Sequence, residues 1–155
     1  MPDLIVLKVR LAYDRDIWRR IAIRGDQTLD HLHEAIYGAF DRDDEHMYTF
    51  YFPIGLKKNK NPRMGSKWLR DVPNYSCDGD DDGFQIGDPH LNRLKLMPKQ
   101  VLYYLFDYGD EWWHEIEVES TGGKLESGKY PRVVEKQGKS PPQYENEDDE
   151  DSDEE

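Results

Sequence analysis

The residues best suited to chemistry gather in the stretch 103–120, YYLFDYGDEWWHEIEVES, where the carboxylate of Asp107 and the imidazole of His114 flank a glycine turn. Carboxylate–imidazole pairs recur in metal sites and in acid–base sites. We expect further polar or aromatic groups from neighbouring segments to join them. The predicted binding cluster is His33, His46, Asp107, Asp110, Trp112 and His114. Because no complete catalytic set is visible, we assign no residue a catalytic role.

The pattern of this stretch predicts a β-hairpin. Residues 101–108 are mostly apolar or aromatic, and residues 114–120 alternate in the period-2 pattern of a strand buried on one side. A turn at Gly109-Asp110 would place Asp107 opposite Trp112 and make it a diagonal neighbour of His114, about 7–8 Å away. The predicted inner face is Val101, Tyr103, Leu105, Asp107, Trp112, His114, Ile116 and Val118. An odd loop length would turn one strand over and break this arrangement.

Burying Asp107 or His114 alone would be costly, so we expect them to hydrogen-bond to each other or to backbone. The simpler interpretation is that Asp107 orients His114 and braces the turn. The alternative is a functional pair. The other hairpin face would carry Tyr104, Phe106, Tyr108 and Trp113. If uncovered, these aromatic residues form a patch that needs a partner, and if covered they form a second core.

Earlier segments must support this hairpin. Leu4–Leu11 and Ile17–Arg24 alternate and predict an antiparallel pair of strands. Thr28 is a good N-cap for a helix that runs to about Phe40. His46–Phe52 predicts a third strand. The helical stripe is Leu29, Leu32, His33, Ile36 and Phe40, at the spacing of one amphipathic face.

The fold class that follows is α+β, a mostly antiparallel sheet with one main amphipathic helix packed on it. The order is β-β-α-β, then a long polar excursion, then β-β, and it suggests a β-grasp-like arrangement. Residues 88–94 predict a short helical turn, and 130–134 a short edge strand because Pro131 suits an edge.

Charge is unevenly distributed along the 155 residues. The chain has 33 acidic and 21 basic residues and a net charge of −12, and nine of the acids lie in residues 145–155. We expect a single domain over 1–144 and a disordered acidic tail over 145–155, because the tail has no apolar residue to bury. The tail could bind a basic partner.

The single cysteine excludes an internal disulfide and fits a reducing compartment. No secretion signal or membrane-length apolar run is visible, so we expect a cytoplasmic protein without a membrane partner.

Two further motifs suggest weaker binding sites. Asp78, Asp80 and Asp82 are spaced like the opening of a calcium loop, but Pro89 falls where the bidentate glutamate should be. These three aspartates are therefore only weak candidates for metal ligands. A basic stripe could form from Arg15, Arg19, Arg20, Arg24 and the loop Lys57–Arg63 and contact nucleic acid.

The motifs IWRRI at 17–21 and FDYGDEWWH at 106–114, with Tyr130-Pro131 and Pro141-Pro142, resemble the plasmid pRiA4b ORF-3-like family over about residues 4–144. The resemblance implies a compact α+β domain of bacteria and archaea with no established activity. Many members have a cysteine after the Tyr-Pro and an acidic pair after the Pro-Pro. This chain has Val133-Val134 and Gln143-Tyr144 there, which puts a site built on those groups in doubt.

Three functions fit the sequence. The first is a non-catalytic binding module for a protein or small-molecule partner, supported by the aromatic residues and hairpin carboxylates. The second is a metal-assisted hydrolase or lyase that uses Asp107, Asp110 and His114, with His33 or His46 across the core. The third and weakest is a nucleic-acid-associated protein. The sequence identifies no cofactor.

Overall fold

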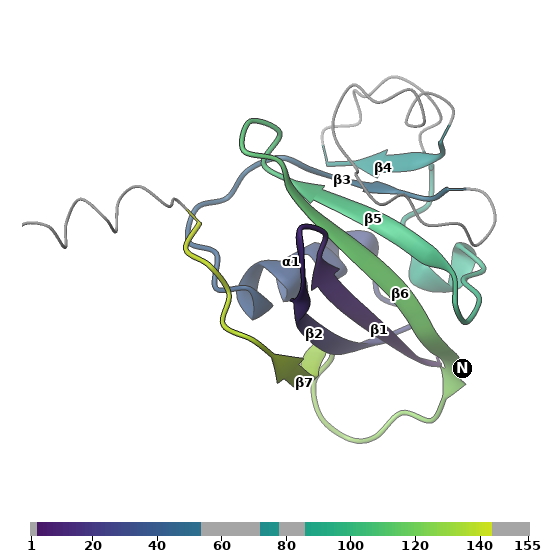
Figure 1. The fold of residues 1–155 in the computed structure, drawn as a ribbon. Helices are drawn as coiled ribbons and strands as arrows, with labels where there is room; N and C mark the ends of the chain where they lie inside the picture. The colour runs from purple at the N-terminus through teal and green to yellow at the C-terminus, as the bar shows by residue number, and fades with distance from the viewer. Residues whose placement is uncertain (1–2, 54–71, 78–85, 144–155) are drawn as a thin grey trace, which may run out of the picture.

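The computed structural model describes residues 3–53, 72–77 and 86–143, and within them one antiparallel sheet carries one α-helix on a face (Figure 1). The strands, in the order β4-β3-β5-β6-β1-β2-β7, confirm the α+β prediction, but not the β-grasp-like arrangement. They are β1 (Leu4–Leu11), β2 (Asp14–Arg24), β3 (Tyr48–Tyr51), β4 (Asn74–Ser76), β5 (Val101–Phe106), β6 (Trp112–Gly123) and β7 (Arg132–Gln137). The helix is α1 (Leu29–Ala39), and a short 3-10 helix, η2, spans Leu91–Arg93.

Three predicted features lie outside the described residues: the basic loop Lys57–Arg63, the carboxylates Asp78, Asp80 and Asp82, and the tail 145–155. Within the described ranges, no helix has both the length and the apolar character to span a membrane.

Helix α1 is held at its start and tied to the sheet by side chains. The Thr28 hydroxyl accepts a hydrogen bond from the His31 amide, and His31 Nδ1 accepts one from the Thr28 amide, which together form a capping box. Asp30 in the first turn accepts hydrogen bonds from the hydroxyls of Tyr48 and Tyr75. These bonds attach α1 to β3 and β4.

Strands β5 and β6 form the expected hairpin, but the predicted register was wrong by one residue. Phe106 pairs with Trp112 and Tyr104 pairs with His114. The loop therefore has five residues, 107–111, and the odd length inverts β5. Asp107 has a φ of 68° and accepts hydrogen bonds at Oδ1 from the amides of Gly109 and Asp110, which closes the loop.

The inversion exchanges the two faces of β5. On the helix side, His114, Ile116 and Val118 of β6 share the main core with Leu102, Tyr104 and Phe106. The predicted inner residues Val101, Tyr103 and Leu105 instead form a second cluster with Tyr51, Val72 and Trp113. Both faces of β5 are buried, so the four aromatic residues predicted to share an outer face do not form an open patch.

Replacing Thr28 by alanine removes the hydroxyl of the capping box. We expect a loss of about 1 kcal/mol in the free energy of unfolding, measured by urea denaturation. Thr28→Ser keeps the hydroxyl and is the matched control. An equal loss in both variants would show that the methyl group, rather than the cap, provides the stabilisation.

Candidate functional site

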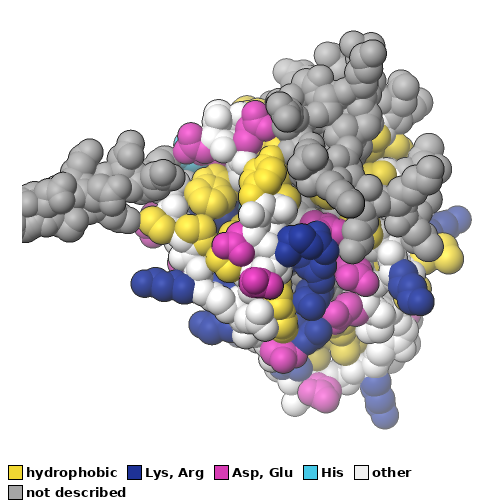
Figure 2. Space-filling view, in the orientation of Figure 1, with side chains coloured by type: hydrophobic (Ala, Val, Ile, Leu, Met, Phe, Trp, Pro, Cys, Tyr) yellow, Lys and Arg dark blue, Asp and Glu magenta, His cyan; other side chains and the backbone are white. Residues whose placement is uncertain are grey.

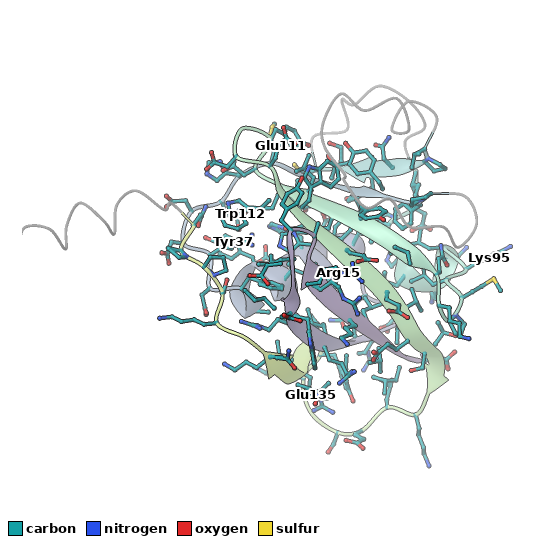
Figure 3. All side chains as sticks on the ribbon, in the orientation of Figure 1. Arg15, Tyr37, Lys95, Glu111, Trp112 and Glu135 are labelled. Carbon is teal, nitrogen blue, oxygen red and sulfur yellow. The ribbon has the colours of Figure 1, made fainter. Side chains whose placement is uncertain are left out.

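The candidate site lies at one end of the sheet, where the loop 41–47 after α1 meets the β5–β6 loop 107–111. The Asp107 amide donates to the Met47 carbonyl at 2.9 Å, which joins the two loops. Figure 3 shows Tyr37, Trp112 and Glu111 along this edge of the molecule. Most of the predicted cluster gathers here, around the rings of Tyr104 and Phe106.

The centre of this end is Arg42, a residue that the sequence analysis did not single out. It is only 5% exposed, and its guanidinium carbon lies 4.7 Å from the Trp112 ring centroid, 5.3 Å from that of Phe106 and 5.6 Å from that of Phe40. Arg42 Nη2 is 3.0 Å from His114 Nε2. Its Nε and Nη1 atoms have no hydrogen-bond partner among the described residues.

The contact between Arg42 and His114 determines the tautomer of the imidazole. A guanidinium can only donate hydrogen bonds, so His114 Nε2 accepts. The proton of the neutral ring is therefore on Nδ1, which donates to the Tyr104 carbonyl at 3.3 Å. Both ring nitrogens of His114 are engaged inside the protein.

Burial sets the protonation states of this pair. Burial lowers the pKa of Arg42 to about 10, so the guanidinium is still charged at neutral pH. Burial, and then the charge of Arg42, hold the pKa of His114 well below its usual value. A charged arginine thus lies against a neutral histidine.

Asp107 and His114 do not pair with each other, but each hydrogen-bonds to backbone, which was the other expected outcome, and Asp107 braces the turn. Asp107 Oδ2 lies 3.4 Å from His46 Nε2, while its Oδ1 holds the loop amides. The cause is the five-residue loop, which takes Asp107 out of the strand at positive φ. Asp110 is exposed, and its amide contacts Asp107.

His33 forms a second buried centre in contact with the first. Its Nδ1 is 2.6 Å from the Tyr104 hydroxyl, and its Nε2 is 3.1 Å from Glu45 Oε1. The ring stacks on Tyr48 with centroids 3.7 Å apart. Burial lowers the pKa of His33, although Glu45 opposes this shift. Burial also raises the pKa of Tyr104 well above its usual value, so its hydroxyl keeps its proton.

The side chains that come together as possible metal ligands differ from the predicted set of Asp107, Asp110 and His114. Asp107, Asp110 and His114 do not converge. Among the described residues, His33, Glu34 and Glu45 do, with ligand atoms all within 4.8 Å of one another. Residues 41–45, Asp-Arg-Asp-Asp-Glu, carried a sequence signal for this region, since one arginine stands within an acidic run.

The predicted basic stripe is largely neutralised. Arg15 pairs with Glu115, Arg20 with Glu119 and Glu135, and Arg24 with Asp26. Arg19 is buried and donates to the carbonyls of residues 18, 39 and 137. In Figure 2 the basic side chains at the centre of the view lie between acidic ones. The described part of the predicted stripe therefore offers no continuous row of unpaired positive charge.

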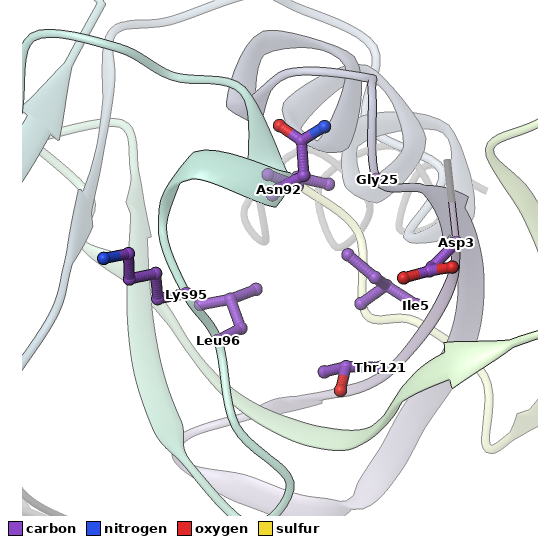
Figure 4. A pocket seen from close by; sticks show the side chains of 8 residues that line it. Asp3, Ile5, Gly25, Asn92, Lys95, Leu96 and Thr121 are labelled. Carbon is purple, nitrogen blue, oxygen red and sulfur yellow. The ribbon is translucent and has the colours of Figure 1, made fainter. Parts of the chain in front are cut away.

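A cleft of about 200 Å³ lies at the opposite end of the sheet (Figure 4). The residues around it include Asp3, Asn92, Lys95 and Thr121. None of the predicted site residues lines this cleft, so it is separate from the cluster around Tyr104.

The buried histidines predict a specific pH dependence of stability. Because the folded pKa values of His114 and His33 are lowered, the unfolded chain binds more protons below about pH 6.5. The contribution of these two histidines to stability should be constant above that pH and fall as the pH drops. For His114 alone, we expect a loss of about 2 kcal/mol between pH 7 and pH 5.

Urea denaturation at these two pH values measures the effect. His114→Gln should make the dependence shallower, whatever its effect on stability at pH 7. An unchanged slope in this variant would mean that His114 is already protonated in the folded protein.

Comparisons with known proteins give the family and the fold. The family described as plasmid pRiA4b ORF-3-like protein matches residues 3–147. None of the curated proteins compared with the chain matches it. A crystal structure of a protein of unknown function from Methanosarcina mazei Go1 aligns over 92% of this chain and 74% of that one, with a TM-score of 0.68 and 23% identity. At this identity the likeness shows a shared fold. The chain belongs to the plasmid pRiA4b ORF-3-like family.

Proposed function

We propose that the domain is a non-catalytic binding module that takes a basic segment of a partner protein at its acidic end. The acidic end consists of the loops 41–47 and 107–111 together with Tyr37 and Trp112. The observation that carries the proposal is its charge balance. The two loops carry seven carboxylates against a single Lys or Arg, which is Arg42, and Arg42 is turned into the core.

Most of these carboxylates face solvent. Asp41, Asp43, Asp44 and Asp110 are exposed, and none of them has a lysine or arginine at ion-pairing distance among the described residues. Carboxylates of like charge held close together repel one another, and a basic partner relieves that repulsion. Such complementary charge speeds association and selects against acidic partners.

Apolar groups at the same end provide a contact surface. Tyr37 and Trp112 are half-buried, and Met47 is 46% exposed. Aromatic faces next to carboxylates suit arginine and lysine side chains, whose stems pack on the ring while the charge meets the acid. Peptide recognition would therefore combine apolar contact with ion pairing.

The buried histidines support binding rather than acid–base chemistry. A general base must reach a substrate proton through an available ring nitrogen. Both nitrogens of His114 already contact buried protein groups, and Nδ1 of His33 contacts the buried Tyr104 hydroxyl. The acidic end also disfavours the third alternative, because it would repel the phosphates of a nucleic acid.

Fluorescence anisotropy with a labelled arginine- and lysine-rich peptide tests the proposal. The variant Asp44→Lys/Asp110→Lys reverses two exposed charges at the acidic end. We expect its dissociation constant to rise at least about tenfold, equivalent to about 1.4 kcal/mol. Binding should weaken with salt, because exposed charges are screened.

The matched control is Asp88→Lys/Glu126→Lys, which makes the same change in net charge at exposed positions away from the two loops. It should change the dissociation constant by less than about twofold. A chain truncated before residue 145 separates any contribution from the acidic tail. Equal weakening in the two double variants, or binding that disappears with the tail, would contradict a site at the acidic end.

A further inference from the structure

Three side chains from two segments direct metal-ligating atoms at one point beside the acidic end. His33 and Glu34 are neighbours on α1, and Glu45 comes from the loop that follows it. His33 Nε2 and Glu45 Oε1 are 3.1 Å apart, and all three ligand atoms lie within 4.8 Å of one another. Adjacent ligands of an ion with bonds of about 2.0–2.1 Å are themselves roughly 3.0–3.4 Å apart. A small movement of Glu34 is enough to complete the set.

The imidazole of this set is held in place by groups that are not ligands. His33 is 2% exposed, its ring stacks on Tyr48, and its Nδ1 contacts the Tyr104 hydroxyl at 2.6 Å. A hydrogen bond to the distal nitrogen is the usual way in which proteins orient a histidine ligand. The Tyr104 hydroxyl can donate or accept, so it can support His33 before and after an ion replaces the proton on Nε2.

The two carboxylates give the site an open side. Glu34 and Glu45 are exposed, which leaves a route for an ion and space for water ligands. The loop that carries Glu45 is fixed on both sides. Arg42 anchors its start in the core, and the Gln143 side chain bonds the amides of Asp43 and Asp44 and the carbonyl of Asp44. The site is therefore partly preorganised.

We propose that His33, Glu34 and Glu45 bind a first-row transition-metal dication such as Zn²⁺, with one imidazole and two carboxylates as protein ligands. A neutral imidazole favours these ions over Ca²⁺ and Mg²⁺, which prefer oxygen ligands alone. The metal site shares Glu45 with the acidic end, but metal binding requires no partner and is measured without a peptide. A single ion occupies it.

Isothermal titration of the full-length chain with Zn²⁺ tests the site. We expect one ion per chain without net proton release near pH 7, because the proton of the neutral ring moves from Nε2 to Nδ1, where the Tyr104 hydroxyl can accept it. Glu34→Gln and Glu45→Gln should each raise the dissociation constant for Zn²⁺ at least about tenfold, because each replaces a charged carboxylate ligand by a neutral amide. Both residues are exposed, so these variants should retain the fold.

The matched controls are Asp43→Asn and Asp44→Asn, which remove the same charge from exposed neighbours outside the set. Their affinity for Zn²⁺ should change by less than about threefold, since only long-range attraction is lost. As a direct readout, Mn²⁺ should broaden the NMR signals of the His33 ring before those of His114.

Equal losses in the control and ligand variants would show diffuse attraction to acidic groups and overturn the proposal. Absence of stoichiometric binding, or Mn²⁺ broadening that leaves His33 unaffected, would overturn it as well. None of these outcomes depends on whether the acidic end binds a basic peptide.

Discussion

The end of the sheet that carries the site depends on one contact, the hydrogen bond from the Arg42 guanidinium to a neutral His114. An unpaired charge taken out of water costs several kcal/mol. The rings of Phe40, Phe106 and Trp112 offset part of this cost, because each cation–π contact contributes about 0.5–2 kcal/mol. His114 supplies a hydrogen-bond acceptor that carries no charge of its own.

This contact organises the surface around it. Arg42 follows the end of α1 and pulls the start of the loop 41–47 into the core, so the carboxylates on either side of it point outward. The same path returns Glu45 to His33, whose ring is fixed by Tyr48 and Tyr104. The acidic binding surface and the metal site therefore share one structural cause and one side chain, Glu45.

Local sequence signals predicted the elements that depend on local chemistry. The cap at Thr28, the buried alternation of Leu4–Leu11 and the edge position of the strand after Pro131 are all confirmed. Each depends on backbone geometry or on one face of one element. The predicted hairpin register was wrong because Asp107 adopts a left-handed conformation and belongs to the loop rather than to the strand. The residue types between the two strands do not determine whether the loop has an even or an odd number of residues.

Arg42 could not be placed from the sequence. An arginine in an acidic run suggests a solvated ion pair, and its burial depends on three rings that come from distant segments. The contacts of Glu45 and Tyr104 with His33 were missed for the same reason, since they span 12 and 71 positions. Prediction from the sequence thus identified the histidines but not the groups that fix their protonation.

The most direct test of this account is the NMR spectrum of the His114 ring nitrogens. At pH 6 the account predicts a neutral ring with its proton on Nδ1 and an unprotonated Nε2, which is the acceptor for Arg42. In Arg42→Met, the Nε2 signal should shift because its donor is lost. A ring that is protonated at pH 6, or a neutral ring with its proton on Nε2, would contradict the arginine–histidine contact on which the site depends.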